Sequence, residues 1–296
     1  MKIIFLGTGS MQPTKTRNLS SIYISHDKDN FLVDCGDGTQ RQMKIADLKP
    51  TKITKILISH FHADHILGLG GIVRSLYANQ YNGTIEIYGP KNLKKFFENI
   101  INSAFYSKGL KIKLIEFEEG KIIETNSLIV EAVKLSHSVP SFGFIFKEKD
   151  KRKINLDYTS KFGLTKHPLL GNLQNGKDII YNNKKIKVEK ATKLVKGKKL
   201  GIITDTEPCS GCLKIAKDSD LLISESTFSE SDLDKAKEYK HMTSKQAATI
   251  AKKAKCKKLI LTHFSQRYKD VKELKREAEL IFSNTETAED FKSFQI

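Results

Sequence analysis

Ser59-His60-Phe61-His62-Ala63-Asp64-His65 is the stretch that decides the fold, with three histidines and an aspartate in its last six residues. It follows the apolar run 55–58, which is typical of a buried strand. In an extended chain, His60 and His62 point to the same side, and a helix that starts behind them turns Asp64 and His65 toward the same space. Because zinc prefers histidine nitrogen and aspartate oxygen, this spacing predicts a metal site at a strand end.

The H-x-H-x-D-H motif resembles the signature of the metallo-β-lactamase superfamily, and the resemblance extends along the whole chain. It implies an α/β fold, an αββα sandwich with metals at the edge between two sheets, formed by residues 1–296 as a single domain. In such a fold the remaining ligands follow later strands. His137 comes after the apolar run 128–135, Asp205 after 200–204 and His263 after 258–262.

The resemblance also assigns these side chains to two zinc ions. It implies that His60, His62 and His137 hold one ion, that Asp64, His65 and His263 hold the other, and that Asp205 bridges them. Two zinc ions suit in-line displacement at phosphorus, and manganese is an alternative metal for the same ligands. Asp64 is also a candidate to hold the proton of the attacking water.

Other motifs resemble one branch of the superfamily, the ribonuclease Z family in its short form. Pro13-Thr14-Lys15-Thr16-Arg17-Asn18 resembles its P-x-K-x-R-N loop, which implies that Lys15, Arg17 and Asn18 contact the acceptor end of tRNA; an ordinary surface turn is the alternative. The segment 34–42 resembles D-C-G-E-G-T-Q-R-Q, with Asp37 in place of the usual glutamate, and 262–268 resembles T-H-F-S-x-R-Y.

Two further segments suggest a general acid. Residues 224–228 resemble the family's H-E-A-T-F, with Ser224 in place of histidine, and 241–243 resemble its His-x-Thr. The resemblance implies that His241 gives a proton to the leaving 3′ oxygen and that Glu225 orients it. A general acid is chemically sensible because an alkoxide is a poor leaving group. A structural histidine at a helix start is the alternative.

Charge favours an anionic partner. Lys and Arg outnumber Asp and Glu by 51 to 34, a formal charge of +17, and nucleic acid is the commonest such partner. Residues 147–199 carry sixteen of the basic side chains against five acidic ones and look like an insertion. They resemble the family's exosite arm, at about 150–180, which grips the tRNA elbow. The implied contacts are Lys151, Arg152, Lys153, Lys161, Lys166 and His167, the last of which replaces the family's usual glycine.

The four cysteines are too sparse for a disulfide framework. Cys209 and Cys212 form a C-x-x-C with no second pair; a redox pair and half of a zinc site are the possible functions, but an ordinary pair of cysteines is favoured, because a structural zinc site needs four ligands. The chain shows neither a signal peptide nor an apolar run long enough to span a membrane, so a cytoplasmic protein is expected.

The periodicity of apolar residues predicts the regular elements. A capping box of Thr243 and Gln246 is expected to start the last long helix. Helices are predicted over 64–76, 91–105 and 243–255, and strands over 2–6, 21–24, 30–34, 55–59, 85–88, 111–117, 128–135, 143–146, 200–204, 221–224 and 258–262.

The resemblance as a whole implies a homodimeric, zinc-dependent endoribonuclease. It would remove the 3′ trailer of precursor tRNA after the discriminator nucleotide, leaving a 3′-hydroxyl on tRNA and a 5′-phosphate on the trailer. The rival hypotheses are a hydrolase of small molecules, such as a phosphodiesterase or a glyoxalase II-like thioesterase, and an RNA-binding protein whose metals are structural. The basic insertion and the loop at 13–18 favour the nuclease over the first rival, and the complete ligand set argues against the second.

Overall fold

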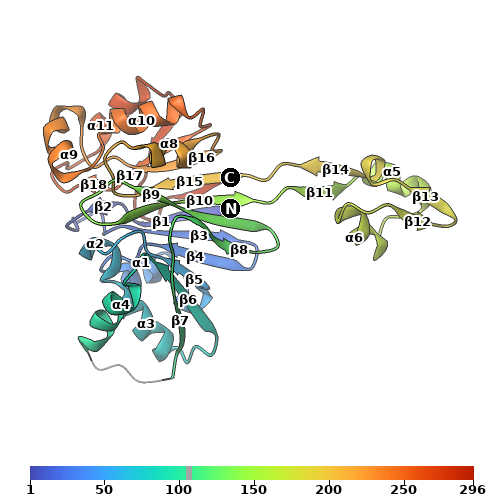
Figure 1. The fold of residues 1–296 in the computed structure, drawn as a ribbon, viewed down its shortest axis with the longest axis horizontal. Coiled ribbons are helices and arrows are strands. Elements are labelled where there is room, and N and C mark those ends of the chain that lie inside the picture. Colours follow the sequence, from blue (N-terminus) through green and yellow to red (C-terminus); the bar gives the residue numbers. More distant parts are fainter. Residues whose placement is uncertain (105–108) are drawn as a thin grey trace. The chain divides into compact units, whose positions relative to one another are not determined.

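The computed structural model describes residues 1–104 and 109–296. These residues form two compact units. The first comprises 1–123, 130–146 and 199–296, and the second comprises 124–129 and 147–198. The larger first unit contains two seven-stranded sheets, which lie between two groups of helices (Figure 1).

The first sheet is built mainly from the N-terminal part of the chain. Its strands, in spatial order, are β20 (Ser293–Gln295), β1 (Lys2–Gly7), β3 (Ser21–His26), β4 (Asp29–Val33), β5 (Lys55–Leu57), β6 (Thr84–Gly89) and β7 (Lys111–Glu116). Strands β1, β3 and β4 pair antiparallel, whereas β4, β5, β6 and β7 run parallel. Parallel strands end at one edge of a sheet, so the segments after β4 and β5 are neighbours.

The second sheet repeats this plan with later segments. Its strands, in order, are β19 (Thr285–Thr287), β17 (Leu259–Thr262), β16 (Leu221–Glu225), β15 (Lys199–Ile203), β10 (Ser141–Glu148), β9 (Leu128–Leu135) and β8 (Gly120–Glu124). Strands β15, β16 and β17 are parallel, which brings the segments after them to one edge. A short pair, β2 (Gly9–Ser10) with β18 (Phe264–Ser265), joins the loops that follow β1 and β17.

Helices cover the outer face of each sheet, and the inner faces pack on each other. Phe31 of β4 meets Phe146 of β10 edge to face, with ring centroids 5.2 Å apart. Burial on both faces explains why the run Leu259–Leu261 of β17 is apolar without alternation. The helices beside the first sheet are α1 (Thr39–Ile45), η1 (Pro50–Lys52), α2 (Ala63–Ile66), α3 (Leu69–Ala78) and α4 (Leu93–Asn102). Those beside the second are α8 (Ser210–Ala216), η3 (Glu230–Asp232), α9 (Leu233–Tyr239), α10 (Ser244–Lys253) and α11 (Lys272–Glu279).

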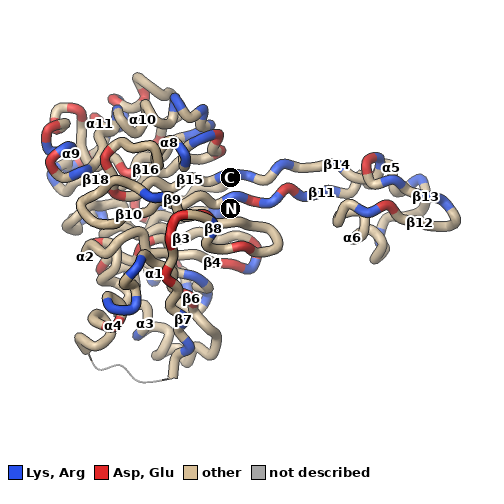
Figure 2. The backbone as a smooth tube through the Cα atoms, in the orientation of Figure 1, with Lys and Arg blue, Asp and Glu red and all other residues tan. Residues whose placement is uncertain are grey.

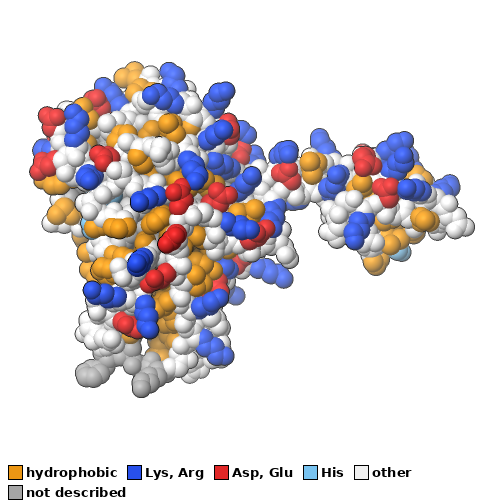
Figure 3. Space-filling model, viewed as in Figure 1, with side chains coloured by type: hydrophobic (Ala, Val, Ile, Leu, Met, Phe, Trp, Pro, Cys, Tyr) orange, Lys and Arg blue, Asp and Glu red, His pale blue; other side chains and the backbone are white. Residues whose placement is uncertain are grey.

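The second unit has a small apolar core of its own. Leu164, Leu173, Ile179 and Ile186 are buried together in it. Blue segments, which are Lys and Arg, recur along its backbone (Figure 2) and on the face of it seen in Figure 3. Its elements are β11 (Lys151–Ile154), α5 (Leu156–Thr159), η2 (Ser160–Phe162), α6 (Leu169–Gln174), β12 (Ile179–Tyr181), β13 (Lys184–Ile186), α7 (Val188–Ala191) and β14 (Thr192–Val195).

The αββα prediction is confirmed, but several boundaries change. The helix predicted over 64–76 is wrong as a single element, because two helices, α2 and α3, meet at Gly68. The break arises because Gly68 N–H bonds to the Cys35 carbonyl oxygen instead of continuing α2. The helix predicted over 91–105 ends at Asn102, and its predicted last residue lies outside the described residues. The capping box at the start of α10 is confirmed.

Candidate metal centre

Most of the predicted ligands lie just beyond strands, and the other two, Asp64 and His65, lie in the short helix α2. His60 and His62 follow β5, and His137 follows β9. Asp205 follows β15, and His263 stands between β17 and β18 with a φ of 60°. Left-handed backbone is unusual for a residue other than glycine, and such strain gathers at functional sites. The edge between the two sheets therefore carries side chains from both halves of the first unit.

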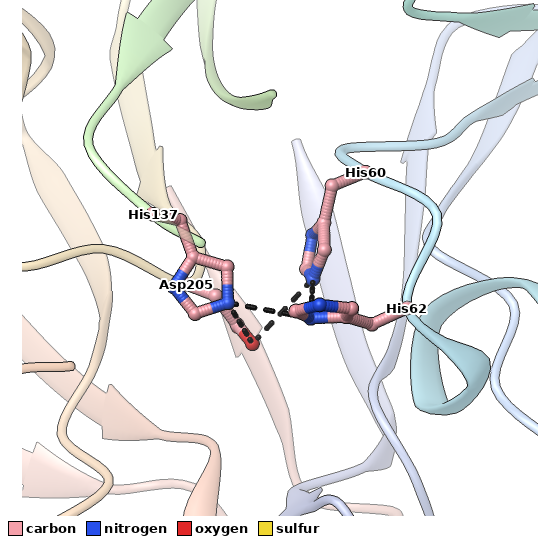
Figure 4. A group of neighbouring side chains, drawn as sticks. All are labelled: His60, His62, His137 and Asp205. Atoms are coloured by element: carbon pink, nitrogen blue, oxygen red, sulfur yellow. Dashed lines mark hydrogen bonds and ion pairs between the residues drawn. The ribbon is translucent and has the colours of Figure 1, made fainter. Parts of the chain in front are cut away.

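Three imidazoles and a carboxylate converge in the first cluster (Figure 4). His62 Nδ1 lies 3.1 Å from His60 Nε2 and 3.3 Å from His137 Nε2. Asp205 Oδ2 is 3.7 Å from His60 Nε2 and 4.0 Å from His137 Nε2. Ring nitrogens and a carboxylate oxygen this close must share a proton or a cation, and these are the ligand atoms that zinc prefers, so the cluster has the form of a metal site.

A second cluster shares Asp205 with the first. His65 Nε2 is 3.2 Å from Asp205 Oδ2, and His263 Nε2 is 3.2 Å from Asp205 Oδ1. Asp64 Oδ2 lies 3.5 Å from each of these two nitrogens. The carboxylate of Asp205 thus belongs to both groups.

The unpaired atoms of the second cluster test whether a metal fits. His65 Nε2, His263 Nε2 and Asp205 Oδ1 are buried and have no hydrogen-bond partner among the described residues. Buried polar atoms without partners are costly, so native structures satisfy them with protein, water or ions. All three atoms point into one cluster and are of the type that zinc binds. The residues therefore fit a divalent metal, and the protein has a metal-binding centre.

The electrostatics of the clusters agree with this interpretation. Burial, together with the neighbouring His65, holds the pKa of His60 well below its usual value, so the ring is neutral and able to bind metal. Burial alone would lower the pKa of His65 as well, but Asp205, Asp64 and Asp34 raise it well above the usual value. The position of His65 thus attracts positive charge, which a bound cation would provide.

Asp34, which follows β4, is a supporting residue for which the sequence suggested only a general role. Its Oδ2 accepts a hydrogen bond of 2.7 Å from His65 Nδ1, which leaves His65 Nε2 facing the cluster. Its Oδ1 accepts from Ser59 N–H at 2.8 Å, and Ser59 Oγ donates to Oδ2 at 2.9 Å. One carboxylate therefore orients both a ligand and the segment that leads to His60. Its place directly after a strand was the available signal.

Glu225 and His241 form a pair beside the second cluster. Glu225 is fully buried, and its Oε1 lies 2.9 Å from His241 Nδ1. Burial alone would lower the pKa of His241, but the Glu225 carboxylate raises it to about 9. Thr227, which the sequence did not single out, lies between the Glu225–His241 pair and the second metal cluster. Its Oγ1 donates to Glu225 Oε2 at 2.8 Å and is 3.1 Å from His263 Nδ1.

A cleft of about 800 Å³ opens over these groups. Ser10 and Met11 line one part of it, and Tyr239, His241 and Arg267 line another. His62, Asp64, His137 and Asp205 also line it, so the metal clusters and His241 share one space. A substrate bound in this cleft would meet all of them.

Some side chains of the loop at 13–18 are exposed to solvent, and others are buried in the protein. Lys15 is exposed, and Asn18 is partly buried and donates through Nδ2 to the Asp37 carbonyl oxygen at 2.9 Å. Arg17 is buried, and its Nη2 donates to the carbonyl oxygens of Ser265 and Tyr268. Arg17 therefore ties this loop to the segment that lines the cleft and is not placed at the surface, where phosphate contact was expected.

The predicted arm residues lie in the second unit. Lys151, Lys153, Lys161, Lys166 and His167 are exposed. Arg152 is partly buried, and its Nη1 donates to Thr192 Oγ1 at 3.1 Å. His167 stands at the start of α6, where its Nδ1 accepts from Leu169 N–H at 3.2 Å. Most of these side chains are thus exposed to solvent and free to contact a bound molecule. Arg152 instead uses part of its guanidinium group in a hydrogen bond within the second unit.

Known proteins match this chain over nearly its whole length. A family model described as "Anti-Pycsar protein Apyc1" matches residues 1–287. A protein named ribonuclease Z from Bacillus cereus is 38% identical, with 100% of this chain and 99% of the relative covered. Another of that name, from Methanothermobacter thermautotrophicus, is 35% identical, with 100% and 97% covered.

Solved structures agree with the sequence relatives. Human tRNase Z, short form, superposes with a TM-score of 0.73 at 29% identity, covering 100% of this chain and 99% of that one. A metallo-β-lactamase fold protein of Bacillus subtilis has a TM-score of 0.72 at 18% identity, covering 99% and 98%, and supports the fold alone. The chain therefore belongs to the family that the matching model describes and, within the metallo-β-lactamase fold, to the ribonuclease Z family.

Proposed function

We propose that the protein is an endoribonuclease that removes the 3′ trailer from precursor tRNA by hydrolysis after the discriminator nucleotide. The products would be tRNA with a 3′-hydroxyl and a trailer with a 5′-phosphate. The observation that carries this proposal is that the metal clusters and the Glu225–His241 pair open into one cleft, in a chain of this family. Metal clusters without an adjacent acid would suit substrates whose leaving group needs no proton.

The residues proposed to hold two zinc ions are those of the two clusters. His60, His62 and His137 would hold one, Asp64, His65 and His263 the other, and Asp205 both. When bound, the ions supply Lewis acidity that offsets charge growing on the phosphoryl oxygens and favours loss of a proton from the attacking water. Mn²⁺ is compatible with the same nitrogen and oxygen ligands.

Asp64 and His241 are the proposed catalytic residues. Asp64 would act on the attacking water, and His241 would act on the leaving 3′ oxygen. His65 and His263 hold the pKa of Asp64 well below its usual value although burial would raise it, so the carboxylate is ionised and can accept a hydrogen bond from the attacking water. The raised pKa of His241 supports a protonated ring at neutral pH, which would give its proton to the leaving 3′ oxygen. Because His241 Nδ1 is bonded to Glu225, the other ring nitrogen is the one that can pass a proton into the cleft.

The second unit is proposed to bind the body of the tRNA. Residues 147–199 carry sixteen basic and five acidic side chains, and a separate apolar core folds them into a unit. Lysines such as Lys161 and Lys166 are exposed and can bind phosphates, which position a nucleic acid without reading its sequence. Lys15, Asn18 and Arg17 are proposed to support the acceptor end, with Arg17 acting through the position of the loop.

The direct test is incubation with an end-labelled precursor tRNA, with and without a chelator, and mapping of the new 3′ end. Cleavage after the discriminator nucleotide that stops with the chelator is the expected result. In His65→Ala, cleavage should vanish while tRNA binding persists. Equal rates on precursor tRNA and on an unstructured RNA of the same length would contradict the substrate assignment, and faster hydrolysis of a small phosphodiester or a thioester would favour the rival hydrolases.

Homodimeric state and cytoplasmic location are proposed on the resemblance to ribonuclease Z. Among the described residues, no helix is both long and apolar enough to cross a bilayer. Sedimentation velocity of the metal-loaded protein tests the dimer, and a single monomeric species at micromolar concentration would contradict it.

A further inference from the structure

The C-x-x-C pair takes no part in the reaction proposed above. The sulfur atoms of Cys209 and Cys212 lie 3.6 Å apart. Because a disulfide has an S–S length of about 2.05 Å, a small movement of the two side chains would join them. Cys209 is half-buried at the edge of a surface hollow between α8 and α10, and Cys212 is fully buried behind it. One thiol is thus within reach of a small oxidant and the second is within reach of the first.

The backbone holds the two cysteines in this arrangement. Cys209 immediately precedes α8, and Cys212 lies in its first turn, where its N–H bonds to the Cys209 carbonyl oxygen at 3.2 Å. Gly211 lies between them and packs directly on the Lys134 carbonyl oxygen, which a side chain at this position would overlap. The start of α8 is therefore pressed against β9, and the two sulfur atoms stay on the same side.

The alternative, half of a zinc site, finds no support among residues 1–104 and 109–296. The groups of metal-type side chains found there contain neither Cys209 nor Cys212. Two thiolates alone do not complete the four ligands of a structural zinc site. Redox chemistry is the function that the pair can perform by itself.

The two thiols also differ in reactivity. The hydrogen bond from Cys212, helped by the Gly211 and Cys212 N–H groups, lowers the pKa of Cys209 to about 5 although burial opposes this. The bond with Cys209 and burial together raise the pKa of Cys212. Cys209 is thus the thiolate that attacks an oxidant, since the thiolate is the nucleophile in thiol–disulfide exchange.

A short path of contacts leads from the pair to the catalytic side of the protein. Cys209 Sγ lies 3.7 Å from Thr206 Oγ1. Thr206 N–H donates to Glu225 Oε1 at 2.9 Å, the same oxygen that faces His241. Thr206 is also the residue after Asp205, and its Oγ1 accepts from Ser136 N–H at 3.0 Å, next to His137. A displacement of Thr206 would reach the general acid and the metal clusters together.

We propose that Cys209 and Cys212 are a redox site, a dithiol that forms a reversible disulfide and thereby slows catalysis through Thr206 and Glu225. The oxidant is a low-molecular-weight disulfide. The Cys209 thiolate attacks one of its sulfur atoms, which forms a mixed disulfide and releases one thiolate. Cys212 then loses its proton to solvent and displaces the second thiolate, so two electrons pass from the protein sulfurs to the two released thiols.

The test uses metal-loaded protein incubated with glutathione disulfide and then with reduced dithiothreitol. Denatured intact mass should fall by the two hydrogen atoms lost on closing the disulfide and should recover on reduction. The kcat for precursor tRNA should fall roughly tenfold and recover, with KM unchanged, because a small displacement of a positioning group is costly in rate. Metal content should not change. The rate effect rests on the proposed function, whereas the mass change does not.

Variants identify the thiols. Cys209→Ser and Cys212→Ala should lose both the mass change and the rate response; the second replaces a buried thiol by a small apolar side chain that the core tolerates. Cys256→Ser is the matched control, because Cys256 is buried elsewhere and its Sγ bonds to the Ala216 carbonyl oxygen, a bond that serine can also make. It should respond like the unaltered protein. Absence of an intramolecular disulfide would overturn the proposal, and a disulfide that leaves kcat unchanged would overturn its link to catalysis.

Discussion

Asp34 shows how one side chain can decide the orientation of a metal ligand that it does not replace. Its bond to His65 Nδ1 selects the tautomer that presents Nε2 to the cluster, and its bonds to Ser59 hold the segment before His60. Such partners tune metal sites almost as strongly as the ligands themselves, because the ring must be held in one orientation to bind.

Asp34→Asn is therefore expected to weaken metal binding. The amide keeps the size of the side chain, but it has one accepting oxygen and no negative charge, so it cannot accept hydrogen bonds from both His65 and Ser59 as the carboxylate does. The affinity for zinc should therefore fall by roughly 10–100-fold. Zinc titration against a competing chelator measures this. Asp37→Asn is the matched control, since the Asp37 side chain is exposed and its carboxylate accepts from Gly38 N–H, far from any metal ligand in sequence. Equal affinities for the two variants would contradict the role given to Asp34.

The pH dependence of the rate follows from the Glu225–His241 pair. A general acid works only while protonated, and the pKa of His241 is raised to about 9. The rate should thus hold through neutral pH and decline as pH rises through about 9. Glu225→Gln removes the negative charge that raises the pKa of His241, while burial still lowers this pKa. The decline of the rate should therefore move to lower pH. The kcat at neutral pH should drop roughly 100-fold, within the usual range for general acid catalysis.

Measured kcat against pH for both proteins checks this expectation. Glu230→Gln is a suitable control, because the Glu230 carboxylate bonds to Thr243 Oγ1 instead. An alkaline limb at the same pH in the Glu225 variant would show that another group provides the proton.

At the scale of elements, the break between α2 and α3 places two ligands. Gly68 N–H bonds to the Cys35 carbonyl oxygen, and Cys35 N–H bonds to the His65 carbonyl oxygen at 2.8 Å. These bonds tie α2 to the loop that follows β4, so Asp64 and His65 are held against Asp34. A continuous helix would satisfy its own backbone groups and would lose these two bonds.

Gly68→Ala should disturb this junction. A side chain there would overlap the Gly36 carbonyl oxygen, and crowding of this kind in a packed interior costs about 1–3 kcal/mol. A lower Tm and weaker zinc binding are expected, measured by thermal denaturation and metal titration. Gly171→Ala is the control, because no atom of another described residue, beyond its chain neighbours and the helix backbone, lies within 4 Å of an added Cβ there and alanine favours helix. Similar effects of the two substitutions would contradict the packing argument.

At the scale of the whole molecule, tRNA recognition and hydrolysis are expected to be separable. Glu148 N–H donates to the Lys198 carbonyl oxygen at 2.9 Å, so the chain enters and leaves the insertion at neighbouring points. A short Gly-Ser linker in place of residues 150–196 can therefore join the two strands. The remaining chain keeps both sheets and every residue of the two metal clusters.

This shortened protein should bind zinc and hydrolyse a small phosphodiester as the full chain does. Its KM for precursor tRNA should rise roughly tenfold or more, and binding should depend less steeply on salt, since fewer phosphates are contacted. Steady-state kinetics at two salt concentrations measure both effects. An unchanged KM and salt dependence would show that the insertion does not bind the substrate.

The resemblance to the metallo-β-lactamase superfamily supplied the αββα fold and the ligands beyond the first motif, whereas the sequence by itself determined the H-x-H-x-D-H motif, the main strands and the capping box of α10. These features depend on neighbouring residues: apolar runs, the spacing in H-x-H-x-D-H, and a threonine three residues before a glutamine. Local signals of this kind survive in a linear pattern, because residues close in sequence share one strand, turn or helix end.

Only the tertiary structure decided the rest, because the decisive contacts join residues far apart in the chain. Asp34 meets His65 across 31 positions, and Arg17 is buried by carbonyl oxygens 248 and 251 positions away. The insertion has short strands and a small core that its sparse apolar pattern did not predict. The sequence favoured no function for the C-x-x-C, and only the structure places its sulfur atoms in contact, with Thr206 between them and Glu225. Hydrogen bonds and burial of this kind depend on the chain's path through space, which no local pattern records.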